Sequence, residues 1–164
     1  MKNGILYGSF NPLHNSHIEL IKEGLKYFDV LHIFVRSVPK DDIVSFDTKK
    51  MWLEKLNEEV GGKLRIYPLD FPPGNVRPDG SFDLVKIFLY TQELSGGSID
   101  GMISGGDKDV WLKELQPAFP DKDFIVIPRS NIRSHAIRDD VDGLKKDIPD
   151  YVYQTLKELV KKSK

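Results

Sequence analysis

The sequence predicts an α/β protein of the Rossmann-like type, with a doubly wound open parallel sheet of about five strands flanked by helices. Short apolar runs alternate with helical patterns along the chain, which is typical of successive βαβ units. The apolar runs are continuous rather than alternating, as expected for strands covered on both faces. At 164 residues one core is sufficient, so residues 1–164 are expected to form a single domain.

The expected strands are apolar runs rich in β-branched and aromatic residues. In chain order they are Gly4–Tyr7, Val30–Val35, Leu64–Leu69, Gly101–Ser104 and Phe124–Ile127. The expected helices show an apolar stripe with spacings of three and four, or follow a proline suited to a first turn. They are Ser16–Tyr27, Thr48–Val60, Phe82–Leu94, Asp109–Leu115 and Tyr151–Lys161. Ser16 and Glu19 have the spacing of a capping box, which predicts that Ser16 caps the first helix.

The composition excludes several classes of function. There is no cysteine, which excludes disulfides, thiolate metal sites and cysteine nucleophiles. With 24 basic and 25 acidic residues, the net charge of -1 provides no broad attraction for nucleic acid or an anionic membrane. No stretch suits a signal peptide or a membrane span. We therefore expect a cytoplasmic protein that binds phosphate groups only locally.

The strongest candidate for a site is Gly8-Ser9-Phe10-Asn11-Pro12-Leu13-His14-Asn15-Ser16-His17, after the first expected strand. Open α/β sheets bind ligands beyond the carboxyl ends of their strands. A helix N-terminus there offers N–H donors to an anion, and His14 and His17 are spaced to face the same way. Taken alone, such histidines are more often cap and surface residues. Two of them also make a poor zinc site.

This segment strongly resembles the G-[ST]-F-[DN]-P-x-H-x-G-H signature of the nucleotidyltransferase superfamily. That group includes nicotinate and nicotinamide mononucleotide adenylyltransferases, pantetheine-phosphate adenylyltransferases and small cytidylyltransferases. Ser16 stands where the signature has glycine. The resemblance implies catalytic roles for His14 and His17, nucleotide binding by Gly8, Ser9 and Phe10, and acceptor binding by Asn11.

A second candidate segment, Ile132-Arg133-Ser134-His135-Ala136-Ile137-Arg138, follows the last expected strand. Arginine forks and a hydroxyl suit phosphate oxygens, although a solvated surface paired with nearby aspartates is the plainer interpretation. The segment is similar to the I-S-S-T-x-I-R motif of the same superfamily. That similarity implies nucleotide binding by Ser134 and a catalytic role for Arg138. Arg133 and His135 depart from the motif, and Arg133 is assigned to the nucleotide because it can still meet a phosphate.

The middle of the chain carries weaker candidates. Gly106, Asp107 and Trp111 look like the G-x-D…W segment of the pyridine mononucleotide adenylyltransferases, which implies nucleotide binding by the first two and acceptor binding by Trp111. A plain strand-to-helix turn is the alternative. Lys40, with Arg36 as its alternative, could reach the phosphates, although a solvated charge is equally compatible. His32 is expected to be a packed core residue.

Together the resemblances imply adenylyl transfer from ATP to nicotinamide or nicotinate mononucleotide by direct in-line displacement. Mg²⁺ would come with ATP rather than occupy a protein metal site. The alternatives are a pantetheine-phosphate adenylyltransferase, a small cytidylyltransferase, or a nucleotide-binding regulator without turnover, which Ser16, Arg133 and His135 favour. The expected partners are small molecules, with no nucleic acid and no membrane, and assembly into a homo-oligomer stays open.

Overall fold

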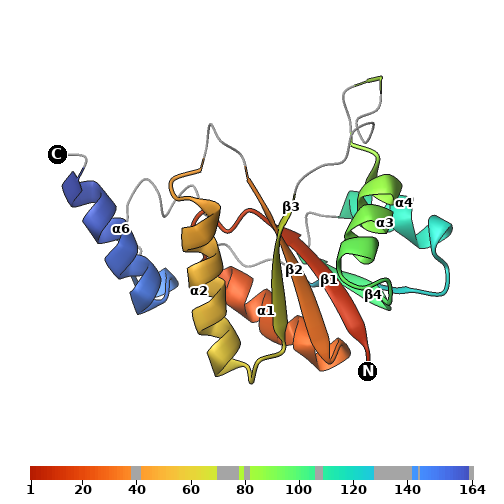
Figure 1. Cartoon of the computed structure of the whole chain (residues 1–164), viewed down its shortest axis with the longest axis horizontal. Coiled ribbons are helices and arrows are strands. Elements are labelled where there is room, and N and C mark those ends of the chain that lie inside the picture. Colours follow the sequence, from red (N-terminus) through yellow and green to blue (C-terminus); the bar gives the residue numbers. More distant parts are fainter. Residues whose placement is uncertain are drawn as a thin grey trace.

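The computed structural model describes residues 1–37, 42–69, 78–79, 82–105, 109–127, 142–143 and 145–162. In this part of the chain, five parallel strands form one sheet in the order β3-β2-β1-β4-β5 (Figure 1). Their bounds are β1 Asn3–Gly8, β2 Val30–Arg36, β3 Leu64–Leu69, β4 Gly101–Gly105 and β5 Asp123–Ile127. The predicted fold class is confirmed, and each predicted strand is found within one residue at either end.

Helices cover both faces of this sheet. One face carries α1 (Asn15–Tyr27) and α2 (Phe46–Glu59), and Figure 1 shows α6 (Asp150–Lys162) on the outer side of α2. The opposite face carries α3 (Leu84–Leu94) and α4 (Asp109–Ala118). Within the described residues, no helix combines the length and the apolarity needed to cross a membrane.

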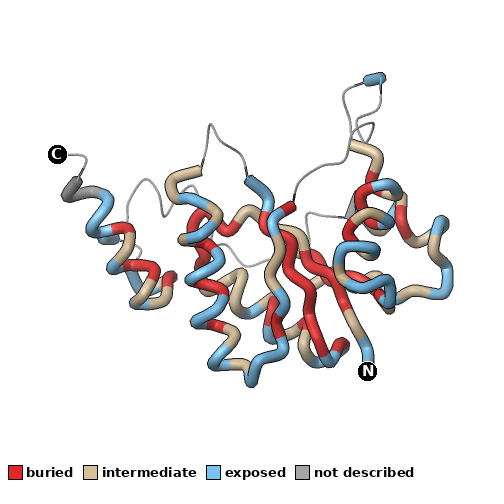
Figure 2. The backbone as a smooth tube through the Cα atoms, in the orientation of Figure 1, coloured by how far each residue is buried: buried red, intermediate tan, exposed pale blue. Residues whose placement is uncertain are grey.

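Two apolar cores lie on the two faces of the sheet, and consecutive strand residues contribute to opposite cores. Leu6 packs with α1 and α2, whereas its neighbour Ile5 packs with α3 and α4. This follows from the strand geometry, in which successive side chains point to opposite faces. Figure 2 shows that the central strands are buried along most of their length, which explains their continuous apolar runs.

The strand order creates a switch point beside β1. Gly4 of β1 is in register with Leu31 of β2 on one side and with Gly101 of β4 on the other. From β1 the chain winds outward to β3 and then returns to β4, so the crossover direction reverses between β1 and β4. Ligands of open α/β sheets bind in the crevice at the carboxyl ends of such strands. The turn that follows Gly8 lies at this end of β1.

His32 is a packed core residue of β2, as predicted. Its side chain is 6% exposed, with Nδ1 3.0 Å from the hydroxyl oxygen of Tyr67 and Nε2 3.1 Å from Oδ1 of Asn3. Burial lowers the pKa of His32 below its ordinary value, and the positive charge of Arg65 adds to the effect.

We expect this histidine to make the protein less stable in acid. Because its folded-state pKa lies below the unfolded value of 6.5, the unfolded chain takes up a proton first as the pH falls. Stability from this group is therefore present above that value and is lost below it. Urea denaturation between pH 8 and pH 5 of the wild type and of His32→Gln should show a smaller acid loss in the variant. Parallel pH profiles would contradict this prediction.

Candidate nucleotide-binding site

His14 and His17 form a capping box at the start of α1. His14 is the N-cap residue, and its Nδ1 accepts a hydrogen bond from the Ser16 amide at 3.1 Å. In return, Nδ1 of His17 accepts from the His14 amide at 3.2 Å. The prediction that Ser16 caps this helix is therefore wrong, because Ser16 lies inside the first turn. The imidazole of His14, in place of the Ser16 hydroxyl, accepts a hydrogen bond from the first turn of the helix, namely from the Ser16 amide.

This pairing determines which nitrogen of each ring carries the proton. The Nδ1 atoms of His14 and His17 accept from backbone N–H groups, so each must keep a lone pair. A neutral ring then carries its proton on Nε2. The two rings are stacked, with centroids 3.8 Å apart and planes inclined by 20°. Since His14 is 1% exposed whereas His17 is only partly buried, His17 is the ring within easier reach of a ligand.

Phe10 packs against His17, and Gly8 leaves room for the Phe10 ring. The Phe10 ring stands edge-on to the His17 ring, with centroids 4.8 Å apart, and is 1% exposed. Gly8 makes room for that ring, because a Cβ atom on Gly8 would lie 2.8 Å from Cζ of Phe10. A contact of Phe10 with a nucleotide would therefore use its backbone. Ser9 lies between them and is partly buried.

Two longer contacts tie the turn to distant parts of the chain. Asn11, which is 3% exposed, accepts a hydrogen bond on Oδ1 from the Ile43 amide at 2.9 Å. Nδ2 of Asn15 donates to the carbonyl of Lys146 at 3.0 Å. Lys146 belongs to a short 3-10 turn, Lys145–Asp147, which follows the late candidate motif in the sequence. The histidine turn is thus held by segments before α2 and before α6.

Several predicted site residues cannot be placed. Lys40, Gly106, Asp107, Arg133, Ser134 and Arg138 lie outside the described residues. Trp111 belongs to α4, although its side chain is outside the described part as well. Arg36, the alternative to Lys40, is exposed at the end of β2, and its guanidinium lies 5.5 Å from the centroid of the Phe82 ring.

A buried ion pair next to the turn was not predicted from the sequence. Lys49 of α2 has an exposed fraction of 0%, and its Nζ lies 2.9 Å from Oδ1 of Asp42. The signal was present, because Lys49 shares one helix face with Trp52, Leu53 and Leu56. A charged residue within an apolar stripe needs a partner, and the sequence pattern does not name that partner.

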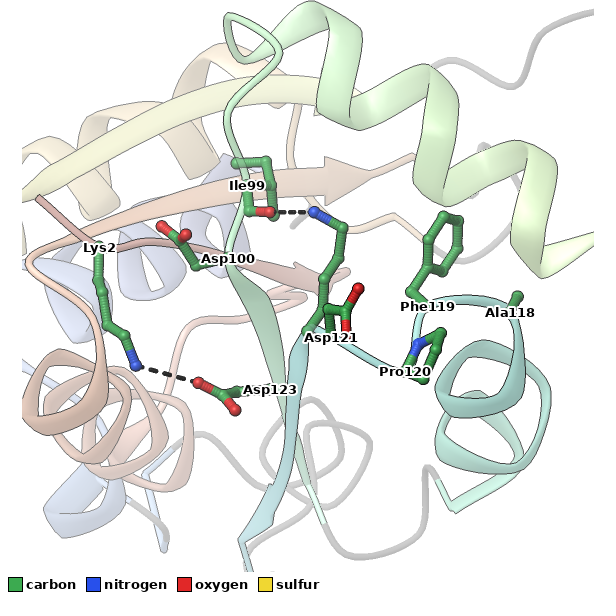
Figure 3. A pocket seen from close by; sticks show the side chains of 9 residues that line it. Lys2, Ile99, Asp100, Ala118, Phe119, Pro120, Asp121 and Asp123 are labelled. Carbon is green, nitrogen blue, oxygen red and sulfur yellow. Dashed lines mark hydrogen bonds and ion pairs between the residues drawn. The ribbon is translucent and has the colours of Figure 1, made fainter.

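A cavity of about 540 Å³ lies at the opposite end of the sheet (Figure 3). It is formed by residues before β1, before β4 and before or at the start of β5, namely Lys2, Ile99, Asp100, Ala118, Phe119, Pro120, Asp121, Lys122 and Asp123. Both lysines are engaged, since Lys2 pairs with Asp123 at 3.0 Å and Lys122 donates to the Ile99 carbonyl. With three carboxylates beside them, this cavity does not suit a triphosphate. The histidine turn is the better candidate.

Comparison with known proteins supports this choice. Residues 5–71 match the family model described as Cytidylyltransferase-like. The matched region extends from β1 to β3 and includes the turn with both histidines, so the predicted resemblance to nucleotidyltransferases is confirmed. None of the curated protein sequences matches the chain.

Three of the solved structures that resemble this chain share its fold over most of its length. One is a Vibrio parahaemolyticus protein provisionally assigned as a nicotinate-nucleotide adenylyltransferase, with a TM-score of 0.64 and 17% identity, covering 95% of this chain and 99% of that one. A bifunctional NMN adenylyltransferase/ADP ribose pyrophosphatase from Francisella tularensis, complexed with AMP and a manganese ion, has a TM-score of 0.65 and 17% identity. The match covers 98% of this chain and 49% of that one.

The third is a pantoate-beta-alanine ligase from Francisella tularensis, complexed with beta-gamma ATP and beta-alanine. Its TM-score is 0.58 at 18% identity, and the match covers 84% of this chain and 65% of that one. The chain therefore spans less than two thirds of both Francisella proteins. At these identities the likeness shows a shared fold alone.

Proposed function

We propose that this protein transfers an adenylyl group from ATP to nicotinate or nicotinamide mononucleotide and releases pyrophosphate. The observation that carries the proposal is the pair of stacked histidines at the N-terminus of α1, each with Nδ1 anchored to backbone. They stand at the carboxyl end of β1, beside the switch point of the sheet. The names of two structural neighbours favour a pyridine mononucleotide as the acceptor.

The proposed reaction needs neither a general base nor a covalent intermediate. An oxygen of the acceptor phosphate attacks the α-phosphorus of ATP, and the bond from that phosphorus to the oxygen bridging the α- and β-phosphates breaks. Phosphate monoesters are largely ionised at neutral pH, so the nucleophile is ready. Catalysis then consists of positioning the two reactants and stabilising the charge that builds up.

His17 would stabilise that charge directly. Because Nδ1 of His17 accepts from the His14 amide, the neutral ring holds its proton on Nε2. This N–H would donate to an α-phosphate oxygen as negative charge grows there. The amide groups at the start of α1 add further donors and the positive end of the helix dipole. His14 would hold His17 in place through its amide and its stacked ring, and would meet the phosphates once ATP enters the turn.

A divalent ion, Mg²⁺, would accompany ATP and neutralise charge on the departing pyrophosphate. Among the described residues, no group of three or more histidines and carboxylates could hold a metal ion. The phosphates of ATP would offer the oxygen ligands that Mg²⁺ prefers. The Francisella adenylyltransferase complexed with AMP and a manganese ion supports the use of a divalent ion.

The other residues keep the roles that the sequence predicts. Nucleotide phosphates and ribose would be held by Gly8, Ser9, Phe10, Lys40, Gly106, Asp107, Arg133 and Ser134, and the acceptor by Asn11 and Trp111. Arg138 would have a catalytic role on the phosphates. The hydrogen bond from Asn15 to Lys146 supports the contribution of the late motif, residues 132–138. Lys146 follows that motif in the sequence, and the bond holds it beside the histidine turn. We also propose that the protein acts in the cytoplasm.

One alternative donor has a specific observation in its favour. The family model that matches residues 5–71 is described as Cytidylyltransferase-like, which favours CTP. The chemistry at the α-phosphorus would be unchanged. Only the base contacts and the acceptor would differ.

Pyrophosphate release with Mg²⁺ tests these proposals. ATP and CTP should each be combined with nicotinamide mononucleotide, nicotinate mononucleotide, phosphopantetheine and glycerol 3-phosphate. We expect release with ATP and a pyridine mononucleotide. Release only with another pair would reject this acceptor or donor but keep the mechanism.

If no pair reacts although ATP raises the melting temperature, the transferase proposal fails for this panel and a nucleotide-binding regulator is favoured. Ser16→Gly then restores the residue of the superfamily signature. Turnover gained by that variant would assign the inactivity to the Ser16 side chain.

A further inference from the structure

Lys49 differs from Lys2 and Lys26, two other described lysines that form ion pairs. Lys2 and Lys26 pair with carboxylates on the surface, with exposed side-chain fractions of 57% and 68%. Lys49 is fully buried, and Asp42, its partner, is only 13% exposed. Removing both charges from water is costly, and apolar residues of the same size would often be at least as stable. Stability alone is therefore a poor explanation for this pair.

The pair joins α2 to the segment that precedes it. Asp42 lies seven residues before Lys49, and the intervening Ser45 caps α2 by accepting from the Thr48 amide at 3.3 Å. With its two ends held in this way, the segment 42–45 has a defined position relative to the helix.

That segment reaches the histidine turn through a hydrogen bond to Asn11. The Ile43 amide, next to Asp42, donates to Oδ1 of Asn11 at 2.9 Å. The Ile43 side chain packs against the core cluster that contains Phe10 and Leu13 of the same turn. Because the side-chain oxygen Oδ1 of Asn11 faces Ile43, the bond also determines where the side-chain nitrogen Nδ2 points. A shift of residues 42–45 would therefore move or rotate the Asn11 side chain.

We propose that Lys49 is a positioning residue of the site: by holding Asp42 it fixes residues 42–45, and through the Ile43 amide it orients Asn11 toward the acceptor. The functional half of this proposal rests on the proposed transferase activity and on the assignment of Asn11 to the acceptor. The structural half concerns the ligand-free protein alone. Lys49 acts through Asp42 and needs no contact with substrate.

The first test is amide hydrogen exchange of the ligand-free protein. In Lys49→Met, the amides of residues 42–46 should exchange about tenfold faster or more, while those of β2 stay protected. Lys50→Met is the matched control, since Lys50 is exposed on the same helix and should leave exchange unchanged. The double variant Lys49→Met/Asp42→Asn removes both charges of the pair. If Lys49→Met does not fold, the same exchange measurement is made on the double variant.

The second test separates a positioning role from a merely structural one. With the substrate pair that reacts, the acceptor KM of Lys49→Met should rise about tenfold or more, with kcat and the KM of the nucleotide nearly unchanged. Unchanged exchange at residues 42–46 in both Lys49 variants would overturn the proposal, as would equal loosening of all strands. An unchanged acceptor KM would overturn its functional half. If no substrate pair reacts, the proposed function fails, and the exchange measurement still decides whether Lys49 positions this segment.

Discussion

Replacing His17 by asparagine is expected to lower kcat by about 10²–10³-fold and to leave the melting temperature close to that of the wild type. The asparagine oxygen can take the place of Nδ1, so the His14 amide keeps an acceptor at the helix start. No donor remains at the position of Nε2, and the charge on the α-phosphate loses its partner. Pyrophosphate release and differential scanning calorimetry measure the two quantities.

Two further variants control this experiment. His17→Ala removes both functions of the ring, so it should lose the same turnover and about 1 kcal/mol of stability through the missing cap acceptor. His17→Gln places an N–H group nearer to Nε2 and should recover part of the turnover. If His17→Asn keeps kcat within about threefold of the wild type, the ring does not stabilise the transition state.

Replacing Gly8 by alanine is expected to reduce both stability and turnover. The added Cβ atom would lie 2.8 Å from Cζ of Phe10, and the buried ring has little room to retreat. Overpacking of this kind costs about 1–3 kcal/mol. Because the same ring stands against His17, its displacement moves the imidazole to which we assign the catalytic role, and a shift of about 1 Å can cost about 10²-fold in rate. Urea denaturation and kcat are the measurements.

A double-mutant cycle identifies the cause. In a Phe10→Leu background the alanine at position 8 has more room, so Gly8→Ala should cost at least about 1 kcal/mol less than in the wild type. Additive effects would contradict a clash with the ring. Glycine would then be needed for close approach of a ligand to the backbone, and turnover would fall without a matching loss of stability.

The central strands were predictable because they are covered on both faces. Val30–Val35 is buried at every position and is apolar except for His32, and a run of that length between polar segments leaves few alternatives. The edge strand Leu64–Leu69 is less covered, since Arg65 and Pro68 are exposed. Helix starts were less predictable. Ser16 fitted a capping box, yet His14 caps α1, and α2 begins at Phe46 with Ser45 as its cap. Several polar residues near a helix start can accept the same amide, and backbone geometry chooses among them.

The candidate site was predictable as a set of residue types. His14 and His17 stand out through their spacing at a strand-to-helix turn and through their resemblance to a long signature. Their mutual hydrogen bonds and the resulting proton positions depend on ring orientation, which the sequence does not encode locally. Lys49 shows the same limit, since its place in an apolar stripe signals a buried charge without naming Asp42.

By itself, the sequence determined the alternation of strands and helices and the parallel sheet. It also identified the histidine turn as the candidate phosphate-binding segment. These properties follow from local patterns of apolar and polar residues and from one motif. Only the tertiary structure decided that Phe10 supports His17 and that Asn11 is held by Ile43. It also decided that the buried ion pair of Lys49 and Asp42 fixes residues 42–45, the segment before α2. The Asn11–Ile43 bond joins residues 32 positions apart, and the geometry of all three contacts exists only after the elements have packed.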